Sequence, residues 1–264
     1  MRKLGIGLCI VLILTGCIFL VYPFLQRELS KIDDISQQTE YQIAVAALSE
    51  KECEDILQEA IEYNNHLDVS AFSKQYNRIL NVDEMIGIMY VPRLNISLSI
   101  YHGTFEEVLA QGVGHLEASA LPVGELSTHA VLCGHSGLPS ISIFDDLDQL
   151  RLGDEISIQI LNRELHYHID QIETVLPEDV QPYLQTIPNK SFVTLVTCTP
   201  YGVNTHRLLI RAELNSITDA PTELASTSTF NSIWFFLVLS VIFMLIVGSI
   251  YRWKRRRKNN AQAV

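Results

Sequence analysis

The sequence predicts an all-β domain, either a barrel or a sandwich, preceded by a helical segment and placed between two terminal membrane helices. Residues 85–214 consist of short apolar or alternating runs separated by Gly and Pro, among them MIGIMYV, ISLSIYHG and RLLIRAEL. Short strands at such spacing are typical of barrels and sandwiches. Residues 4–25 and 230–251 contain no charged residue, and each segment matches the roughly 20 apolar residues that cross a bilayer as a helix.

The residues that flank these apolar segments predict their orientation. Arg2 and Lys3 precede the first segment, and six of the seven residues at 252–258 are basic. Because positively charged residues stay on the cytoplasmic side, we expect both termini in the cytoplasm and the domain between them outside the cell membrane. A cleavable signal peptide is the alternative for residues 1–25. The long apolar run, with no small-x-small cleavage site after it, favours a retained anchor followed by an exterior domain.

Charge and composition exclude several classes of protein. The chain has 264 residues, 19 of them basic and 30 acidic, with a net charge of −11 and 48% hydrophobic residues. All the acidic residues lie between Glu28 and Glu223, so the middle of the chain is more acidic than the average. A disordered chain would be less apolar, and a nucleic-acid-binding domain would be basic.

The exterior part divides into a helical prefix, a β domain and a tether. Residues 40–67 contain no Gly or Pro and mix apolar and acidic positions at helical spacing, which predicts one or two amphipathic helices within a prefix at 26–84. The β domain spans 85–214. Residues 215–229 are polar and rich in Ser and Thr, as expected of a linker to the second membrane helix at 230–251. Residues 252–264 form a basic cytoplasmic tail.

Three cysteines belong to the exterior. Cys9 and Cys17 fall in the first apolar segment, which leaves Cys53, Cys133 and Cys198. An odd number argues against a disulfide framework. We interpret Cys53 as part of a helix and Cys133 as a buried small hydrophobe.

Cys198 lies in a pattern that indicates chemistry. A run of β-branched residues from Ser191 ends at Cys198, and Arg207 opens a second strand after a loop with Pro, Gly and Asn. If the two strands pair, Cys198 and Arg207 flank one another at the end of the sheet. His135 follows another apolar run and begins a loop rich in Gly and Pro, where scaffolds present functional side chains. A thiolate, an acid/base and an oxyanion donor make an acyl-transfer site.

The same residues resemble a known family. TLVTCTPYGVNTHRLLIR resembles the Cys-to-Arg signature of sortases, and HAVLCGHSGLP resembles the segment around their histidine. IYHGTFEEVLAQGVGHLEASALPVGE is similar to the strand and helix that precede it. Together these motifs cover about 85–214, and the closest match is the class C, pilin-polymerising branch.

The resemblance implies an eight-stranded β-barrel and a reaction without a metal or other cofactor. It makes Cys198 the nucleophile, His135 the general acid/base and Arg207 the cation that orients the substrate and stabilises the oxyanion, while Thr197 would line the substrate groove. The implied substrates are proteins with an LPXTG-like sorting signal, cut between Thr and Gly through a thioester. The implied acceptor is an amine, in this branch usually a pilin lysine.

Two alternative functions and the presence of a lid stay open at this point. A sortase that anchors proteins to cell-wall peptidoglycan carries the same motif, and an inactive membrane-bound binding module is a candidate of another class, although the complete Cys, His and Arg set argues against it. Many class C members also carry an Asp-Pro-aromatic lid over the site. Residues 68–82 contain no Pro, so a lid made by Phe72 or Tyr76 rests on the position of this segment alone.

Overall fold

The computed structural model describes residues 2–66, 75–117, 119–137 and 143–220, together with positions 240, 244 and 248. The chain divides into two compact units, Met1–Thr222 and Glu223–Val264. All the strands described below belong to the first unit. Of the two segments predicted to cross the membrane, most side chains of 4–25 and nearly all of 230–251 lie outside the described residues. In the described part of the chain, no helix is sufficiently long and apolar to span a bilayer.

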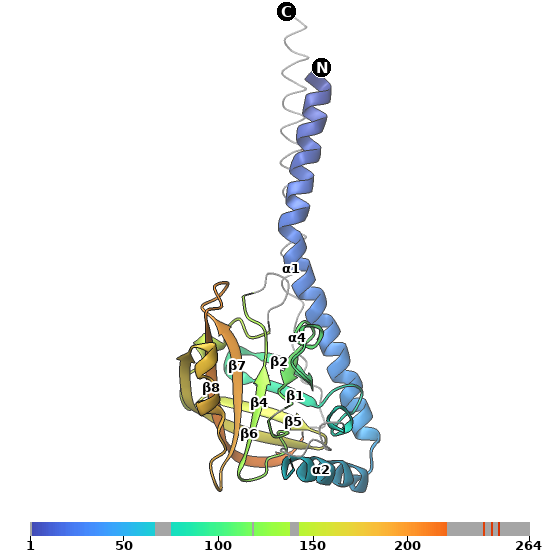
Figure 1. Cartoon of the computed structure of the whole chain (residues 1–264). Helices are drawn as coiled ribbons and strands as arrows, with labels where there is room; N and C mark the ends of the chain where they lie inside the picture. The colour runs from blue at the N-terminus through green and yellow to red at the C-terminus, as the bar shows by residue number, and fades with distance from the viewer. Residues whose placement is uncertain are drawn as a thin grey trace, which may run out of the picture. The chain divides into compact units, whose positions relative to one another are not determined.

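A closed barrel of eight strands forms the body of the first unit (Figure 1). Its strands follow one another around the barrel in the order β1-β2-β3-β4-β7-β8-β6-β5. The pairs β2–β3 and β4–β7 are parallel, and the other pairs are antiparallel. The strands are β1 Gly87–Val91, β2 Ile96–His102, β3 Val113–His115, β4 Thr128–Cys133, β5 Glu155–Ile160, β6 Arg163–Val175, β7 Ser191–Thr199 and β8 His206–Asp219. The mainly-β prediction is therefore confirmed, with the barrel in place of the sandwich.

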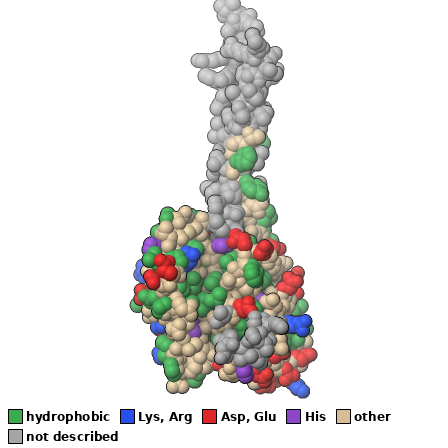
Figure 2. Space-filling model, in the orientation of Figure 1, with side chains coloured by type: hydrophobic (Ala, Val, Ile, Leu, Met, Phe, Trp, Pro, Cys, Tyr) green, Lys and Arg blue, Asp and Glu red, His purple; other side chains and the backbone are tan. Residues whose placement is uncertain are grey.

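Helices precede the barrel, as the sequence predicted for the prefix at 26–84. α1 runs over Arg2–Ala47 and α2 over Glu50–Asn64, and α2 begins at a capping box made by Ser49 and Glu52. The acidic residues of α2 face solvent, where Figure 2 shows them at the lower right of the molecule. Short helical segments connect the strands: η1 Tyr76–Arg78, η2 Pro92–Leu94, α4 Glu106–Leu109, η3 Leu147–Gln149, η4 Pro177–Asp179 and η5 Gln181–Leu184.

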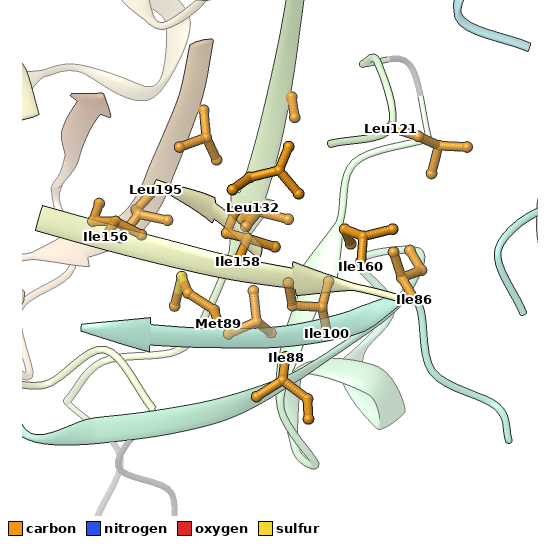
Figure 3. Packing of buried hydrophobic residues seen from close by; sticks show 14 of the residues in the cluster. Ile86, Ile88, Met89, Ile100, Leu121, Leu132, Ile156, Ile158, Ile160 and Leu195 are labelled. Atoms are coloured by element: carbon orange, nitrogen blue, oxygen red, sulfur yellow. The ribbon is translucent and has the colours of Figure 1, made fainter. Parts of the chain in front are cut away.

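The barrel interior is filled by alternate residues of its strands. Ile156, Ile158 and Ile160 of β5 are fully buried and pack with Met89 and Leu195 (Figure 3). Because successive side chains of a strand point to opposite faces, this parity decides which residues of each strand face outward. Each fully buried side chain of this size contributes about 1.5–3 kcal/mol.

The helical prefix docks on this barrel through buried polar contacts. Tyr41 of α1 is fully buried, and its hydroxyl accepts from Leu161 N–H at 2.9 Å and donates to the Ile86 carbonyl at 3.2 Å. Asp34 accepts from the hydroxyl and the backbone N–H of Ser99, and burial raises the pKa of Asp34 to about 6. The prefix and the β domain therefore share one core.

Strand β8 is longer than the sequence predicted. It reaches Asp219, which pairs with Arg163 of β6. The linker predicted to begin at residue 215 therefore begins later, because the 13-residue strand β6 offers a partner for the polar end of β8. Ser216 and Thr218 belong to this exposed end, where hydrophobic periodicity carries no signal.

Candidate active site

Cys198 and Arg207 lie directly opposite one another on the adjoining strands β7 and β8. Directly opposed residues of an antiparallel pair share a face of the sheet. Leu195 of β7 and Ile210 of β8 oppose one another and point into the core. Cys198 lies three residues after Leu195 on the same strand, so its side chain points to the opposite face. Cys198 and Arg207 therefore face outward, and both side chains are partly exposed.

His135 reaches the same end of the sheet from β4. β4 runs parallel to β7, with Cys133 opposite Val196, and the ladder continues through a bond from Gly134 N–H to the Val196 carbonyl at 3.1 Å. His135 is the next residue. Two strand pairs, one parallel and one antiparallel, therefore place the three residues Cys198, His135 and Arg207 at one end of the sheet.

Two hydroxyls attach the histidine loop to the cysteine strand. The Thr197 hydroxyl donates to the Gly134 carbonyl at 2.8 Å, and the Ser136 hydroxyl donates to the Cys198 carbonyl. Both residues are buried, at 4% and 6% exposed. These bonds tie the backbone on either side of His135 to Thr197 and Cys198, so they hold the relative position of the histidine loop and the cysteine strand.

A close approach of two loops completes this arrangement. Gly137, two residues after His135, has φ +80°, and a Cβ there would lie 2.6 Å from the backbone nitrogen of Gly202 in the β7–β8 loop. Only glycine fits so close to another backbone in this conformation. The loop is also held by Asp145, whose carboxylate accepts from Gly137 N–H at 2.9 Å.

The outer face of β4 and β7 forms the surface beside the three groups. In Figure 2 hydrophobic side chains gather in a hollow at the centre of this face of the molecule. Cys133 lies on this face, next to Val196, and is only partly buried, because Leu132 occupies the inward position of β4. Burial, with the nearby Cys198, raises the pKa of Cys133 to about 11. Our interpretation of Cys133 as a core residue therefore requires correction: it borders the site, as a protonated thiol.

The connection between β6 and β7 is held against the same face. His129 of β4 bonds through Nδ1 to the Gln185 carbonyl at 3.0 Å and through Nε2 to the Thr194 hydroxyl at 2.7 Å. Arg211 stacks over the Phe192 ring, with its guanidinium carbon 4.5 Å from the ring centroid. This segment therefore has a defined place beside the outer face of the sheet.

The remaining predicted site residues have different surroundings. The Thr197 hydroxyl is used by Gly134, so a substrate-lining role for this residue stays a prediction. Tyr76 is 2% exposed and bonds to His115 and Gly103, away from the surface, whereas Phe72 lies outside the described residues. The lid therefore stays a prediction. No group of three potential metal ligands occurs in the described ranges.

Two residues near the site were not singled out from the sequence. Ser136 is a loop serine with no motif to mark it, and its bond to the Cys198 carbonyl depends on the pairing of β4 with β7. Glu106, on α4, brings Oε2 to 3.3 Å from His135 Nε2, from 29 residues earlier in the chain. Its place in an acidic pair at the start of a helix indicated only a helix N-terminus.

Comparisons with known proteins agree with this geometry. A family model described as the sortase domain matches residues 89–215. The structure is similar to sortase C1 of Streptococcus agalactiae, with 43% identity over 68% of this chain and 97% of the other and a TM-score of 0.65. It is also similar to sortase C of Streptococcus pneumoniae, whose structure is described with reference to pilin substrate specificity, with 35% identity over 70% and 98% of the chains and a TM-score of 0.65. Sortase D of Bacillus subtilis is 26% identical over 172 residues, 65% of this chain and 80% of that protein.

Proposed function

Because the chain belongs to the sortase family and is a cysteine transpeptidase closest to class C, we propose that it cleaves an LPXTG-like sorting signal and joins the product to a pilin lysine. The observation that carries the proposal is the placement of Cys198, His135 and Arg207 at one end of β4, β7 and β8. Support for the pilin acceptor comes from the similar solved structures, most of which are sortase C proteins.

In the proposed reaction, the Cys198 thiolate attacks the carbonyl carbon of the sorting-signal threonine. Arg207 donates to the carbonyl oxygen as negative charge develops on it. The guanidinium is oriented for this by bonds from Nη1 to the His206 carbonyl at 3.1 Å and the Asn204 carbonyl at 3.4 Å. The first acceptor opens β8 and the second lies in the β7–β8 loop, so the segment that follows Cys198 also orients the cation.

Collapse of the tetrahedral intermediate breaks the Thr–Gly bond. Protonated His135 gives its proton to the leaving glycine amine, and the threonine acyl group remains on Cys198 as a thioester. An incoming amine then attacks the thioester and loses its proton to His135, and the Cys198 thiolate is released. The proton that His135 takes from the amine in the second half restores the protonated His135 and the Cys198 thiolate with which the first half begins.

We propose that the barrel acts outside the cell, tethered to the cell membrane by residues 4–25 and 230–251 with both termini in the cytoplasm. The support is the absence of charge in both segments and the basic residues beyond them. Surface-protein and pilin substrates would reach the site from the same side of the membrane.

A mass-spectrometric experiment tests the proposal. The chain is incubated with an LPXTG-type peptide, and the thioester adduct is expected on Cys198 and absent from Cys198→Ala. Addition of a lysine-containing pilin peptide or of a peptidoglycan-type amine then identifies the acceptor. An adduct on Cys133 would overturn the site assignment, and transfer to the peptidoglycan amine alone would favour the wall-anchoring alternative.

A further inference from the structure

We propose that Glu106 is a positioning residue for His135, holding its Nε2 so that Nδ1 is the nitrogen that exchanges a proton with the substrate; this inference rests on the proposed function. Glu106 Oε2 lies 3.3 Å from His135 Nε2. That nitrogen is closed to solvent and has no hydrogen-bond partner within the described ranges. The Glu106 carboxylate thus makes an ion-pair contact, without hydrogen-bond geometry, with a buried nitrogen of the general acid/base.

The backbone fixes where Glu106 is presented. α4 packs against β3, and a Cβ on Gly114 of β3 would lie 2.9 Å from Leu109 Cδ2 of α4 and 2.3 Å from the Gly103 carbonyl oxygen. The absence of a side chain at Gly114 therefore allows α4 to lie close to the sheet. β3 in turn pairs with β4 through Gly114 and Cys133, two residues before His135. The start of α4 and the end of β4 are consequently held side by side.

A carboxylate on this nitrogen has two effects. It restrains rotation of the imidazole, because an anion lies at one edge of the ring, and its negative charge interacts favourably with the positively charged ring that the first half of the reaction uses. Because Nε2 is closed to solvent and faces Glu106, Nδ1 is the nitrogen left to give a proton to the glycine amine and to take one from the acceptor. Glu106 thereby acts through His135 and does not touch the reacting atoms.

The charge of Glu106 differs from the other charges around His135 in its sign or in the stage of the reaction at which it is present. The cation of Arg207 on β8 opposes a positive charge on His135, whereas an ionised Cys198 on β7 favours it. Glu106 supplies a negative charge that is present in both halves of the cycle, including the thioester stage, when the sulfur carries no charge. The titratable groups on the elements around His135 are Glu106 of α4, Cys133 of β4, Asp145 of the histidine loop, Cys198 of β7 and Arg207 of β8.

Exposure sets the size of the expected effect. The His135 side chain is 22% exposed and that of Glu106 is 76% exposed. Ion pairs in contact with water are weakened by solvent and by salt. Loss of the Glu106 charge should therefore lower kcat several-fold, on the order of 3- to 10-fold, which is far less than loss of a group that contacts the reacting atoms.

The test compares Glu106→Gln with Glu107→Gln in the full chain. The two substitutions remove the same charge from neighbouring exposed residues of one helical turn, and only the first faces His135. Transfer of an LPXTG-type peptide to an amine is measured between pH 5.5 and 9.5 at low and high salt, together with the rate of Cys198 alkylation by iodoacetamide over the same range. The alkylation rate reports the coupling between Cys198 and His135 whether or not the chain transfers peptides.

For Glu106→Gln we expect the lower kcat with KM within twofold of the wild type, pH profiles of transfer and alkylation displaced to lower pH, and weaker dependence on salt. Glu107→Gln should match the wild type, and Glu106→Asp should recover part of the loss. The inference is overturned if both Gln variants have the same pH profiles, or if Glu106→Gln loses kcat with unchanged profiles, as a structural defect would. Absence of transfer by the wild type would instead overturn the proposed function, with the alkylation profiles still deciding the role of Glu106.

Discussion

Replacing Tyr76 by Phe should destabilise the fold strongly, although it removes one oxygen atom. The Tyr76 hydroxyl lies 2.8 Å from His115 Nδ1 and accepts from Gly103 N–H at 3.0 Å. His115 is fully buried, and its Nε2 lies 2.8 Å from the Ala120 carbonyl. Burial lowers the pKa of His115 to about 4, so the ring is neutral at pH 7. Nε2 then donates to Ala120, and the single proton of the Tyr76 hydroxyl serves two acceptors of His115, its Nδ1 and its carbonyl oxygen, each at 2.8 Å.

Loss of the hydroxyl therefore leaves the buried Gly103 N–H without its acceptor, and removes the one donor that His115 Nδ1 and the His115 carbonyl share. Each of these two losses costs about 1–3 kcal/mol, so the free energy of unfolding should fall by about 2–6 kcal/mol. That is a large part of the 5–15 kcal/mol that is typical of a folded domain, by order of magnitude. The measurement is urea unfolding at pH 7.5, with the midpoint and the slope compared between the wild type and the variant.

Tyr63→Phe is the matched control. Tyr63 belongs to α2, is 3% exposed, and donates a single bond of 2.7 Å to the Glu117 carbonyl. Glu117 is exposed, so water can replace the lost donor, and we expect a loss of about 1 kcal/mol. Equal losses for the two variants, or a loss below about 0.5 kcal/mol for Tyr76→Phe, would refute the account of His115 as a neutral acceptor.

Three further measurements test other parts of the structure. Gly137→Ala should lower transfer activity roughly 10-fold or more by displacing the histidine loop, whereas Gly153→Ala, with φ +86° and no atom within 4 Å of its Cβ, should cost only the backbone strain of about 1 kcal/mol. Because the folded-state pKa of His115 lies below its usual 6.5, stability should decline as the pH falls from about 6.5 to 4, by about 3 kcal/mol from this group. Asp34, with a raised pKa, acts in the opposite direction as its carboxyl takes up a proton, so the titration is made in Asp34→Asn as well, where the decline should be steeper. At pH 8, alkylation of Cys133 should be on the order of 100-fold slower than that of an exposed cysteine with an ordinary pKa, because its own pKa is about 11; equal rates in a mass-spectrometric time course would show that its thiol is not buried.

The parts of the site predicted from sequence are those that depend on neighbouring segments. Ser191–Thr197 and the run after Arg207 carry strand patterns with one loop between them, and an antiparallel hairpin with this loop places Cys198 opposite Arg207. The capped helix α2, with its acidic face in water, follows equally from local spacing. Placement of His135 required the resemblance to sortases, because no local pattern states which strand lies beside β7.

The surroundings of Tyr76 and Glu106 show the opposite case. Tyr76 and His115 are separated by 39 residues, and no periodicity in either segment predicts that a hydroxyl of one meets a ring nitrogen of the other. The segment 68–82 that suggested a lid therefore contains a buried anchor at Tyr76. Cys133 differs from its prediction for a similar reason, since inward or outward direction depends on strand parity within the closed sheet.

By itself the sequence determined the strand-rich character of the middle of the chain, the helical prefix and the pairing of Cys198, the proposed nucleophile, with Arg207. Each of these follows from hydrophobic period, turn chemistry or a short hairpin, which are properties of residues close together in the chain. The tertiary structure alone decided the closure into a barrel, the parallel pairing that brings His135 to Cys198, and the approach of Glu106. These depend on contacts between distant segments. The partners in such contacts are decided by the packing of the whole core and by the order of the strands around the barrel.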